Sequence, residues 1–277
     1  MAEHGGDWLS RTLTDLRKAA GMSQTSAAVR AGFGSGGGQV RLSRIETGQF
    51  TPTEDEVRRL CDAYAAPPAL RSLCLLWAAR DIRDGGVSSR VILASAAGHQ
   101  ARLGAVEEAS QQIRAWQPLL IPGLLQTEDY ARAVFSDRLS GAAADAAVAA
   151  RRARTRILDS GRSFTFVISE GALRWNAGPA VMRGQFAHLA EAAGRYRVGV
   201  IAQRQVVTTF PVHGFGLFDD RLVVAGMRHA AVLIGDAASV AEYVAWFAKL
   251  EGLAVFGAEA QDVIATVARD YRAHGEG

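Results

Sequence analysis

The spacing of apolar residues near the N-terminus predicts a series of short amphipathic helices. Leucines recur at i, i+4 and i+7 between Leu9 and Leu16, and Gly21 then ends the first helix because glycine readily closes a helical segment. A second, alanine-rich helix is expected over residues 24–31, with the hydroxyl of Ser23 as its N-cap. Its small side chains allow a neighbouring helix to approach closely.

Two more helices are expected after a glycine-rich turn. In the third helix, over residues 39–47, Leu42 and Ile45 face inward while the polar positions lie on other faces. The fourth helix begins at Thr51 or Thr53, and two consecutive prolines close the segment. Short helices in this order are typical of a helix-turn-helix domain.

The remaining chain mixes helical and strand patterns, which predicts an α+β protein. We expect an all-α helix-turn-helix domain over residues 1–66 and a connecting helix with a hinge over residues 67–87. A mixed α/β domain is expected over residues 88–277. A chain of 277 residues is long enough for two domains of this kind, since roughly 150 residues per domain is usual.

The second domain is predicted to alternate helices with strands. Pro118 and Pro122 exclude a continuous helix, so the segment around them is expected to be extended and to turn at Pro122-Gly123. The expected helices cover residues 99–116, 151–158 and 179–194 and the segments that begin after Thr127 and at Ala237. The expected strands cover residues 164–174, 196–203, 214–219 and 221–227, with a turn at Asp219-Asp220.

Composition excludes several protein classes. Hydrophobic residues make up 49% of the chain and charged residues 21%, which excludes a disordered or fibrous protein. No apolar run reaches the roughly 18 residues of a membrane span, and the first residues lack the basic and apolar regions of a signal peptide. We therefore expect a cytoplasmic protein without a membrane partner.

Positive charge is concentrated in one segment. The whole chain carries a formal charge of only +3. Residues 8–48, however, hold six cationic side chains and two acids, whereas residues 49–84 hold five arginines and six acids. A local basic excess is the electrostatic pattern of a module that meets phosphates, although a solvated helix face would give the same excess.

The N-terminal motifs resemble a known class of regulators. The segments GMSQTSAAVRAG, LSRIETGQFTP and VRRLCDAY occur in the order found in phage-repressor or XRE-type helix-turn-helix regulators, and the resemblance covers about residues 8–66. It implies a protein that binds double-stranded DNA and is nucleoid-associated when bound. One departure is the glycine-rich turn at residues 34–38, which makes the connection about four residues longer than is usual in the family.

The resemblance assigns six side chains to DNA, in two groups. Base edges in the major groove would be read by Gln39, Val40 and Arg44. Backbone phosphates would be held by Gln24, Arg41 and Ser43. Glu46 is expected to bond within the domain. The alternative for the assigned residues is an ordinary solvent-exposed position.

Two other patterns point to no cofactor, metal or disulfide. Gly32, Gly34 and Gly37 satisfy G-x-G-x-x-G, but a helix and not a strand precedes them, so they are not a dinucleotide site. Cys61 and Cys74 have no partner at metal-ligand spacing and are expected to be buried. No cofactor and no metal ion are expected.

A second resemblance covers the remainder of the chain. The segment IPGLLQTEDYARAV resembles the signature of an actinobacterial domain of unknown function (DUF5753-like), found in antitoxin-like regulators of Streptomyces. It implies that the C-terminal domain binds a small protein partner encoded nearby or a small-molecule effector. A homodimer is expected because one recognition helix reads only a few base pairs.

No catalytic motif is found, so we expect a protein that is not an enzyme. Glu170, with Arg174 and His188 downstream, is the best enzymatic candidate, and a structural carboxylate is the simpler interpretation. The alternative function is an enzyme or small-molecule-binding protein that retains a helix-turn-helix domain. A basic run at Arg151, Arg152, Arg154 and Arg156 would extend a DNA-binding surface or form a solvated helix face.

Overall fold

The computed structural model of this chain describes residues 8–34, 36–78, 89–93, 96–210, 212–228 and 230–274. The chain divides into two compact units. The first contains Met1–Ile92 with the short segments Asp220–Val223 and Val232–Glu242, and the second contains Leu93–Asp219, Val224–Ala231 and Tyr243–Gly277. Most of the predicted hinge, residues 79–88, lies outside the described residues.

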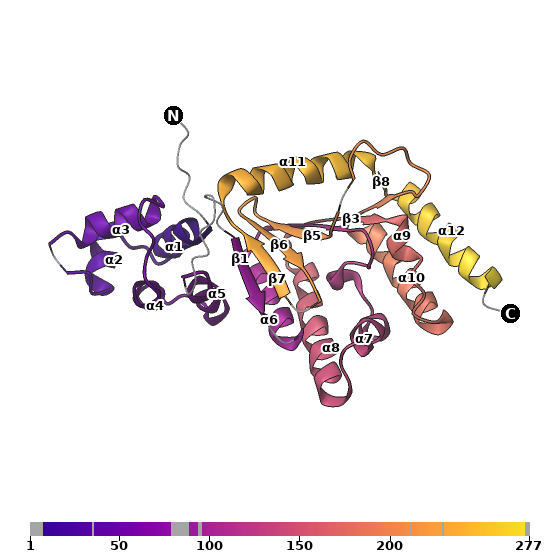
Figure 1. The fold of residues 1–277 in the computed structure, drawn as a ribbon, viewed down its shortest axis with the longest axis horizontal. Coiled ribbons are helices and arrows are strands. Elements are labelled where there is room, and N and C mark those ends of the chain that lie inside the picture. The colour runs from indigo at the N-terminus through magenta and orange to yellow at the C-terminus, as the bar shows by residue number, and fades with distance from the viewer. Residues whose placement is uncertain are drawn as a thin grey trace. The chain divides into compact units, whose positions relative to one another are not determined.

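Five helices form the N-terminal part of the first unit (Figure 1). They are α1 (Trp8–Ala19), α2 (Gln24–Arg30), α3 (Gly38–Glu46), α4 (Glu54–Ala63) and α5 (Pro68–Ala78). The four predicted helices are confirmed within one or two residues at most of their ends. Of the two candidate caps of the fourth helix, Thr53 is the one used: its hydroxyl accepts from the backbone N–H of Glu56, whose carboxylate accepts from the N–H of Thr53.

The core of this helical part is built from the predicted inward positions. Leu13, Ala27, Leu42, Ile45 and Leu60 are completely buried. This apolar contact surface stabilises helices that are each too short to be stable alone in water. The two cysteines on α4 and α5 are also buried, as expected, and both are free thiols.

A tryptophan pair in the first unit encloses a glycine that is distant in sequence. The rings of Trp8 and Trp77 lie 5.3 Å apart, and the backbone N–H of Trp8 donates to the carbonyl of Gly235 over 3.1 Å. A Cβ added to Gly235 would lie 2.6 Å from atoms of both tryptophans. Only glycine therefore permits this approach of the 232–242 segment to α1 and α5.

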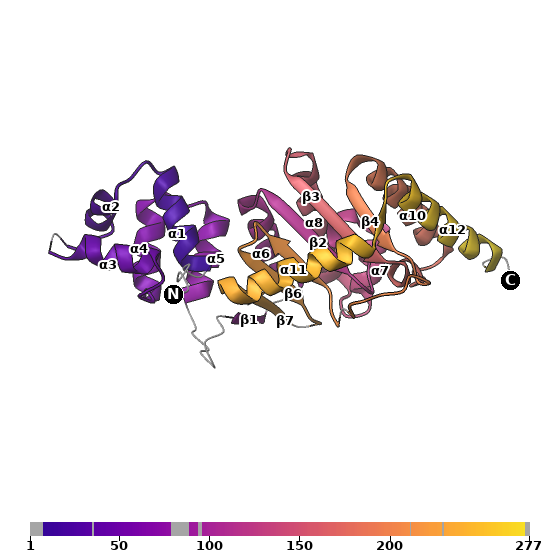
Figure 2. The same ribbon diagram turned by 90° about the horizontal axis from the view of Figure 1, so that it is seen from above.

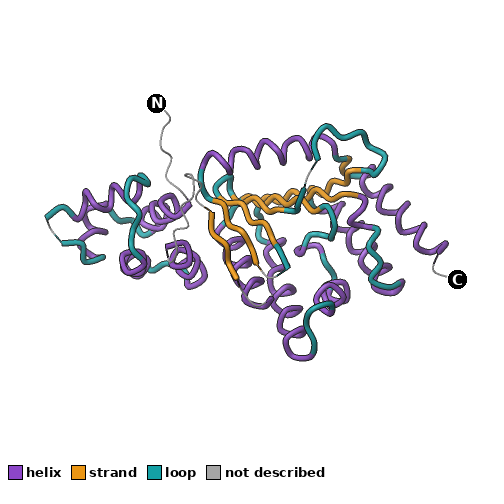
Figure 3. Tube along the Cα trace, in the orientation of Figure 1, coloured by secondary structure: helices purple, strands orange, loops and turns teal. Residues whose placement is uncertain are grey.

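The strands of the chain form one mixed sheet in the order β1-β7-β6-β5-β2-β3-β4-β8, seen as the orange strands of Figure 3. Their bounds are β1 (Ser89–Leu93), β2 (Gln112–Gln117), β3 (Ser163–Ser169), β4 (Arg197–Ile201), β5 (Phe215–Phe218), β6 (Leu222–Gly226), β7 (Ala230–Ile234) and β8 (Val255–Phe256). Strands β2, β3 and β4 are parallel, while β5 pairs antiparallel with β2 and β8 antiparallel with β4.

Helices cover both faces of this sheet. Helix α11 lies on one face, and α6, α8 and α10 lie on the other (Figures 1 and 2). The helical segments are α6 (Ala96–Ala109), η1 (Gly123–Leu125), α7 (Glu128–Ser136), α8 (Gly141–Thr155), η2 (Arg156–Asp159), α9 (Glu170–Leu173), α10 (Pro179–Arg195), α11 (Ala237–Leu253) and α12 (Ala258–His274). The α+β class, with a helical N-terminal part before a mixed α/β domain, is thereby confirmed.

One helix cap and one turn predicted from the sequence are confirmed. Thr127 caps α7, since its side-chain oxygen accepts from the backbone N–H of Tyr130 over 3.3 Å. Asp219 and Asp220 both have φ of +51°, the left-handed conformation that a tight turn between consecutive antiparallel strands favours.

Two predicted elements are wrong in part. The helix predicted over residues 99–116 ends at Ala109, and Gln112–Gln117 forms strand β2 between β3 and β5. Ile113 and Trp116 fit a helical period, but in a strand they point to opposite faces of the sheet, and both are buried because helices cover both faces (Figures 1 and 2). The strand predicted over residues 164–174 ends at Ser169, whose hydroxyl accepts from Ala172 and starts helix α9.

The basic run of α8 is not a solvated helix face. Arg154 is buried and forms a bidentate ion pair with buried Glu107, with a shortest separation of 2.5 Å. Arg151 is partly buried, whereas Arg152 lies in solvent and pairs with Glu128 over 3.3 Å. The run therefore divides between the interior and the surface, because successive residues of a helix point about 100° apart.

Candidate nucleic-acid interface

Helix α3 presents a polar face opposite its buried face. Gln39, Val40 and Arg44 are exposed, and Val40 is exposed to 51%. Leu42 and Ile45, on the opposite side of the same helix, are completely buried. The three residues predicted to read bases are therefore available on one short, well-anchored helix.

The N-terminus of α3 has no side-chain cap. Gly37 is the N-cap residue, with φ of +94°, and the first turn consists of Gly38, Gln39 and Val40. The N–H groups of a first turn have no partner within their own helix. Together with the partial positive charge of the helix end, they form a natural contact for a phosphate oxygen. Ser35, in the preceding turn, lies outside the described residues.

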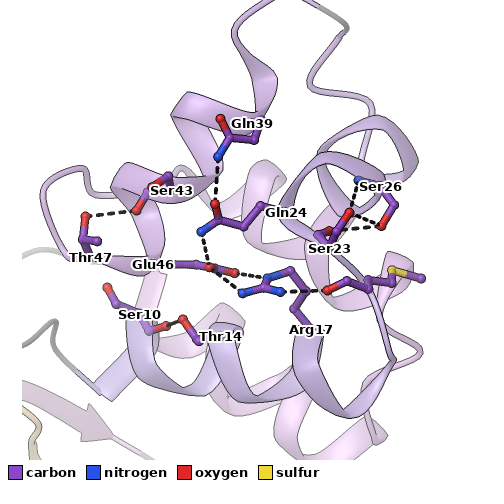
Figure 4. Close-up of polar contacts among 11 residues, drawn as sticks. Ser10, Thr14, Arg17, Ser23, Gln24, Ser26, Gln39, Ser43, Glu46 and Thr47 are labelled. Atoms are coloured by element: carbon purple, nitrogen blue, oxygen red, sulfur yellow. Dashed lines mark hydrogen bonds and ion pairs between the residues drawn. The ribbon is translucent and has the colours of Figure 1, made fainter.

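A chain of side-chain hydrogen bonds joins α3 to α2 and α1 (Figure 4). Nε2 of Gln39 donates to Oε1 of Gln24 over 2.8 Å, and Nε2 of Gln24 donates to Oε2 of Glu46 over 2.8 Å. Both ends of the Gln24 amide are thus engaged within the domain. Gln24 lies at the N-terminus of α2 beside the predicted cap Ser23, which accepts from Ser26 N–H over 3.1 Å.

This series of hydrogen bonds ends in a buried ion pair between Glu46 and Arg17. Nε and Nη2 of Arg17 donate to the two carboxylate oxygens of Glu46 over 2.6 and 2.9 Å, and Nη1 donates to the carbonyl of Met22 over 2.7 Å. The side chains of Arg17 and Glu46 are exposed to only 12% and 5%. The hydrogen bond to Glu46 raises the pKa of Arg17 above its ordinary value. Glu46 therefore bonds within the domain, as the sequence predicted.

Arg41 has partners inside the protein. Its Nε forms an ion pair with Glu56, and its guanidinium lies 4.4 Å from the centroid of the Phe50 ring. Burial acts to raise the pKa of Glu56, but the bonds from Arg41 and Thr53 outweigh it and lower that pKa overall. Arg41 was predicted to hold a phosphate, which stays a prediction; the structure shows an ion pair with Glu56 that joins α3 to α4.

Three other basic side chains of the helix-turn-helix domain have no such partner. Arg44, Arg30 and Lys18 are exposed, and none forms a side-chain hydrogen bond or ion pair within the part of the chain that the structure describes. Ser43 is half-buried, and its carbonyl accepts from the Thr47 hydroxyl over 3.0 Å. Arg44 is thus the one cation among the three predicted base-reading residues, and it has no partner among the described residues.

Sequence reasoning missed two residues that position this surface. Arg17 was counted only as a charge, and Glu56 was not singled out. The signal for Glu56 is its place three residues after the cap Thr53, the spacing of a capping box. Arg17 has no comparable local signal, because its partner Glu46 lies 29 residues away.

Of the candidate enzymatic residues, Glu170 and Arg174 are brought together and His188 is not. Glu170 accepts from Arg174 at 2.5 Å and from the backbone N–H of Gln203 at 2.9 Å. Burial acts to raise the pKa of Glu170, but these bonds lower it overall. His188 lines a separate cavity to which Glu170 and Arg174 do not contribute. Among the described residues no three His, Cys, Asp or Glu side chains form a group that could hold a metal ion.

Comparison with known protein families identifies both parts of the chain. Residues 100–266, more than half of the sequence, match the model of a domain of unknown function (DUF5753). The chain belongs to the DUF5753 family. Residues 8–73 of this DUF5753 protein match a helix-turn-helix domain, so α1–α4 and the first part of α5 form that module. The helix-turn-helix module and the DUF5753-like domain found in the sequence are confirmed, whereas the XRE class and the antitoxin-like role stay predictions.

Comparisons with curated proteins and solved structures give no further information on the function of this DUF5753 protein. No curated protein matches it. A solved structure described as that of TrmBL2, an archaeal chromatin protein with a novel mode of DNA binding, is 11% identical with a TM-score of 0.32, which supports no argument about fold or function. The match covers 62% of this chain and 55% of that one. No helix in the described residues is long and apolar enough to cross a membrane.

Proposed function

We propose that this protein is a sequence-specific DNA-binding transcriptional regulator that inserts α3 into the major groove. The observation that carries the proposal is the exposed face of Gln39, Val40 and Arg44 on a helix whose opposite face is buried. Arginine bonds guanine through two donors, glutamine bonds adenine, and a valine methyl group contacts the thymine methyl. Gln24, Arg41, Ser43 and the open N-terminus of α3 would hold phosphates.

The bonding of the basic residues supports distinct roles for Arg44 and Arg41. Because Arg44 has no partner among the described residues, its whole donor set is available to a base edge. Arg41 is 44% exposed while it is paired with Glu56, so it can contact a phosphate only from a fixed position. In this arrangement Arg44 specifies sequence and Arg41 positions the helix.

Arg44→Ala is expected to weaken binding to the operator by about 1–3 kcal/mol, which is roughly 5- to 150-fold in Kd, because a bidentate base contact is lost. Fluorescence anisotropy with DNA from upstream of the gene measures this change. Arg58→Ala is the matched control: it removes the same charge from α4, where Arg58 pairs with Glu54 over 2.9 Å. Equal effects of the two variants, or no DNA binding at low salt, would contradict the proposal.

The regulator would bind DNA as a homodimer, with each α3 reading one half-site. Half-sites for such dimers lie about one helical turn apart, and two copies supply the specificity that one short helix lacks. Light scattering of the protein with and without its DNA is expected to show two chains per complex. A monomer in both samples would contradict this arrangement.

The C-terminal domain would act by binding and not by catalysis. Family resemblance suggests a small partner protein encoded nearby, in an antitoxin-like arrangement, or a small-molecule effector. The engagement of Glu170 by Arg174 and Gln203 supports a structural role for that carboxylate. A small-molecule effector is favoured by a cavity of the second unit that Arg151 lines. Together with the DNA-binding role, these assignments fit a cytoplasmic protein.

A further inference from the structure

The second unit contains a cavity of about 250 Å³, and Arg151 lies in its wall. Residues of η1, α7, α8, η2 and α10 line it. Its apolar surface comes from side chains such as Leu124, Ala131, Val148 and Leu158, and Arg151 contributes to the wall from α8. The cavity is partly open, and polar and charged side chains line it together with the apolar ones. A hollow that combines apolar side chains with placed polar groups is a usual form of a ligand site.

The Arg151 side chain is held in place by neutral groups. Its Nε donates to Oε1 of Gln100 over 2.9 Å, and its Nη1 donates to Oε1 of Gln126. The guanidinium lies 4.7 Å from the centroid of the Phe135 ring. A Cβ on Gly123 would lie 3.3 Å from the same guanidinium, so this glycine leaves room for it. The position of the charge is therefore well defined.

No acid neutralises this guanidinium. Among the described residues no carboxylate pairs with Arg151, and its Nη2 takes part in no hydrogen bond. The nearby Glu107 is already bound through both oxygens by Arg154. Burial, followed by the field of Arg154, lowers the pKa of Arg151 to about 9. Burial and the same cations also lower the pKa of His99 to about 4.

The other cations that line the cavity have acids of their own. Arg152 pairs with Glu128 over 3.3 Å, and Arg195 pairs with Asp159 over 3.1 Å. Only Arg151 therefore leaves one positive charge without a partner among the described residues of the lining. A charge that is partly removed from water is less favourable unless an opposite charge pairs with it.

We propose that this cavity binds a small organic carboxylate, whose anion pairs with Nη2 of Arg151 and whose apolar part packs against Leu124, Ala131 and Val148. The proposal rests on the sensing role proposed above for the C-terminal domain and names the class of its effector. The planar arginine fork matches a carboxylate or a phosphate. One unpaired charge and an apolar wall favour the monoanionic acid.

A thermal-shift measurement on the full chain without DNA tests this site. The probes are benzoate and hexanoate at 10 mM, with benzamide and hexanamide as neutral controls of the same shape and inorganic phosphate as the other anion, all at constant ionic strength. At least one carboxylate is expected to raise the Tm by about 2–4 °C while its amide does not, because the acid binds only the folded state. Phosphate is expected to have a smaller effect.

Two variants test separately whether binding needs the charge of Arg151 and the space of the cavity. Arg151→Met keeps most of the side-chain volume and is expected to lose the shift. Thr155→Phe, at a half-buried lining position, narrows the cavity with Arg151 intact and is expected to lose it as well. The proposal is overturned if neither acid shifts the Tm, if the amides or phosphate shift it equally, or if both variants retain the shift. Because no DNA is present, these outcomes are independent of whether α3 binds an operator.

Discussion

Glu46→Ala is expected to destabilise the helix-turn-helix domain by about 3–5 kcal/mol, the usual effect of leaving one member of a buried ion pair without its partner. The substitution removes the acceptor of two Arg17 bonds and one Gln24 bond. Arg17, exposed to 12%, then keeps a charge that water cannot solvate well. Urea unfolding followed by circular dichroism measures the lost free energy.

Asp62→Ala is the matched control for Glu46→Ala. Asp62 also pairs with an arginine, Arg71, over 2.9 Å, but its side chain is 59% exposed. Exposed pairs contribute at most about 1 kcal/mol, so this variant is expected to change stability little. Similar losses in the two variants would show that burial of the Arg17–Glu46 pair does not decide its contribution. Glu46→Ala is also expected to weaken DNA binding, because Gln24 and Gln39 lose their anchor.

Glu107→Ala is expected to have the largest effect in the C-terminal domain, a loss of about 3–5 kcal/mol or more. Glu107 and Arg154 are exposed to 4% and 7%. Without this carboxylate, the guanidinium groups of Arg154 and Arg151 would be close together with no nearby acid. Thermal or urea unfolding of the purified chain measures the loss.

Two further variants test whether the loss of stability in Glu107→Ala comes from the broken ion pair. Glu108→Ala removes the same charge one residue along α6, from an exposed position, and is expected to stay within about 0.5 kcal/mol of the parent protein. The double variant Glu107→Leu with Arg154→Met replaces the pair by apolar groups, and it is expected to lose less stability than Glu107→Ala alone. An equal or larger loss in the double variant would mean that the pair is required for its shape and hydrogen bonds and not only for charge balance.

Much of the DNA-binding face was predictable from local pattern. The 3.6-residue period places Leu42 and Ile45 inward and hence Val40 and Arg44 outward, and the structure agrees. The caps Ser23, Thr53 and Thr127 follow from side-chain oxygens at helix starts, which depends only on residues three positions apart. Such features can be predicted from the sequence because each depends on the residues of a single helix.

The contacts that orient this face were not predictable in the same way. Arg41 and Glu56 are 15 residues apart, and Arg17 and Glu46 are 29 apart. Whether such charges meet depends on how two helices cross, which no local period encodes. The same holds for Arg151, which the sequence places in a basic run but whose partners Gln100 and Gln126 come from other segments.

The sequence by itself determined the helix-turn-helix module, the family of the C-terminal domain and the outward residues of α3. Only the tertiary structure decided that Gln112–Gln117 is a strand at the centre of the sheet, because a segment of six residues with three apolar side chains fits either period until its neighbours are known. It also decided which arginines are paired and which single one lies unpaired in the wall of a cavity. Two charged side chains pair only if they lie close together in space. For most of these pairs that distance depends on how elements far apart in the chain pack together.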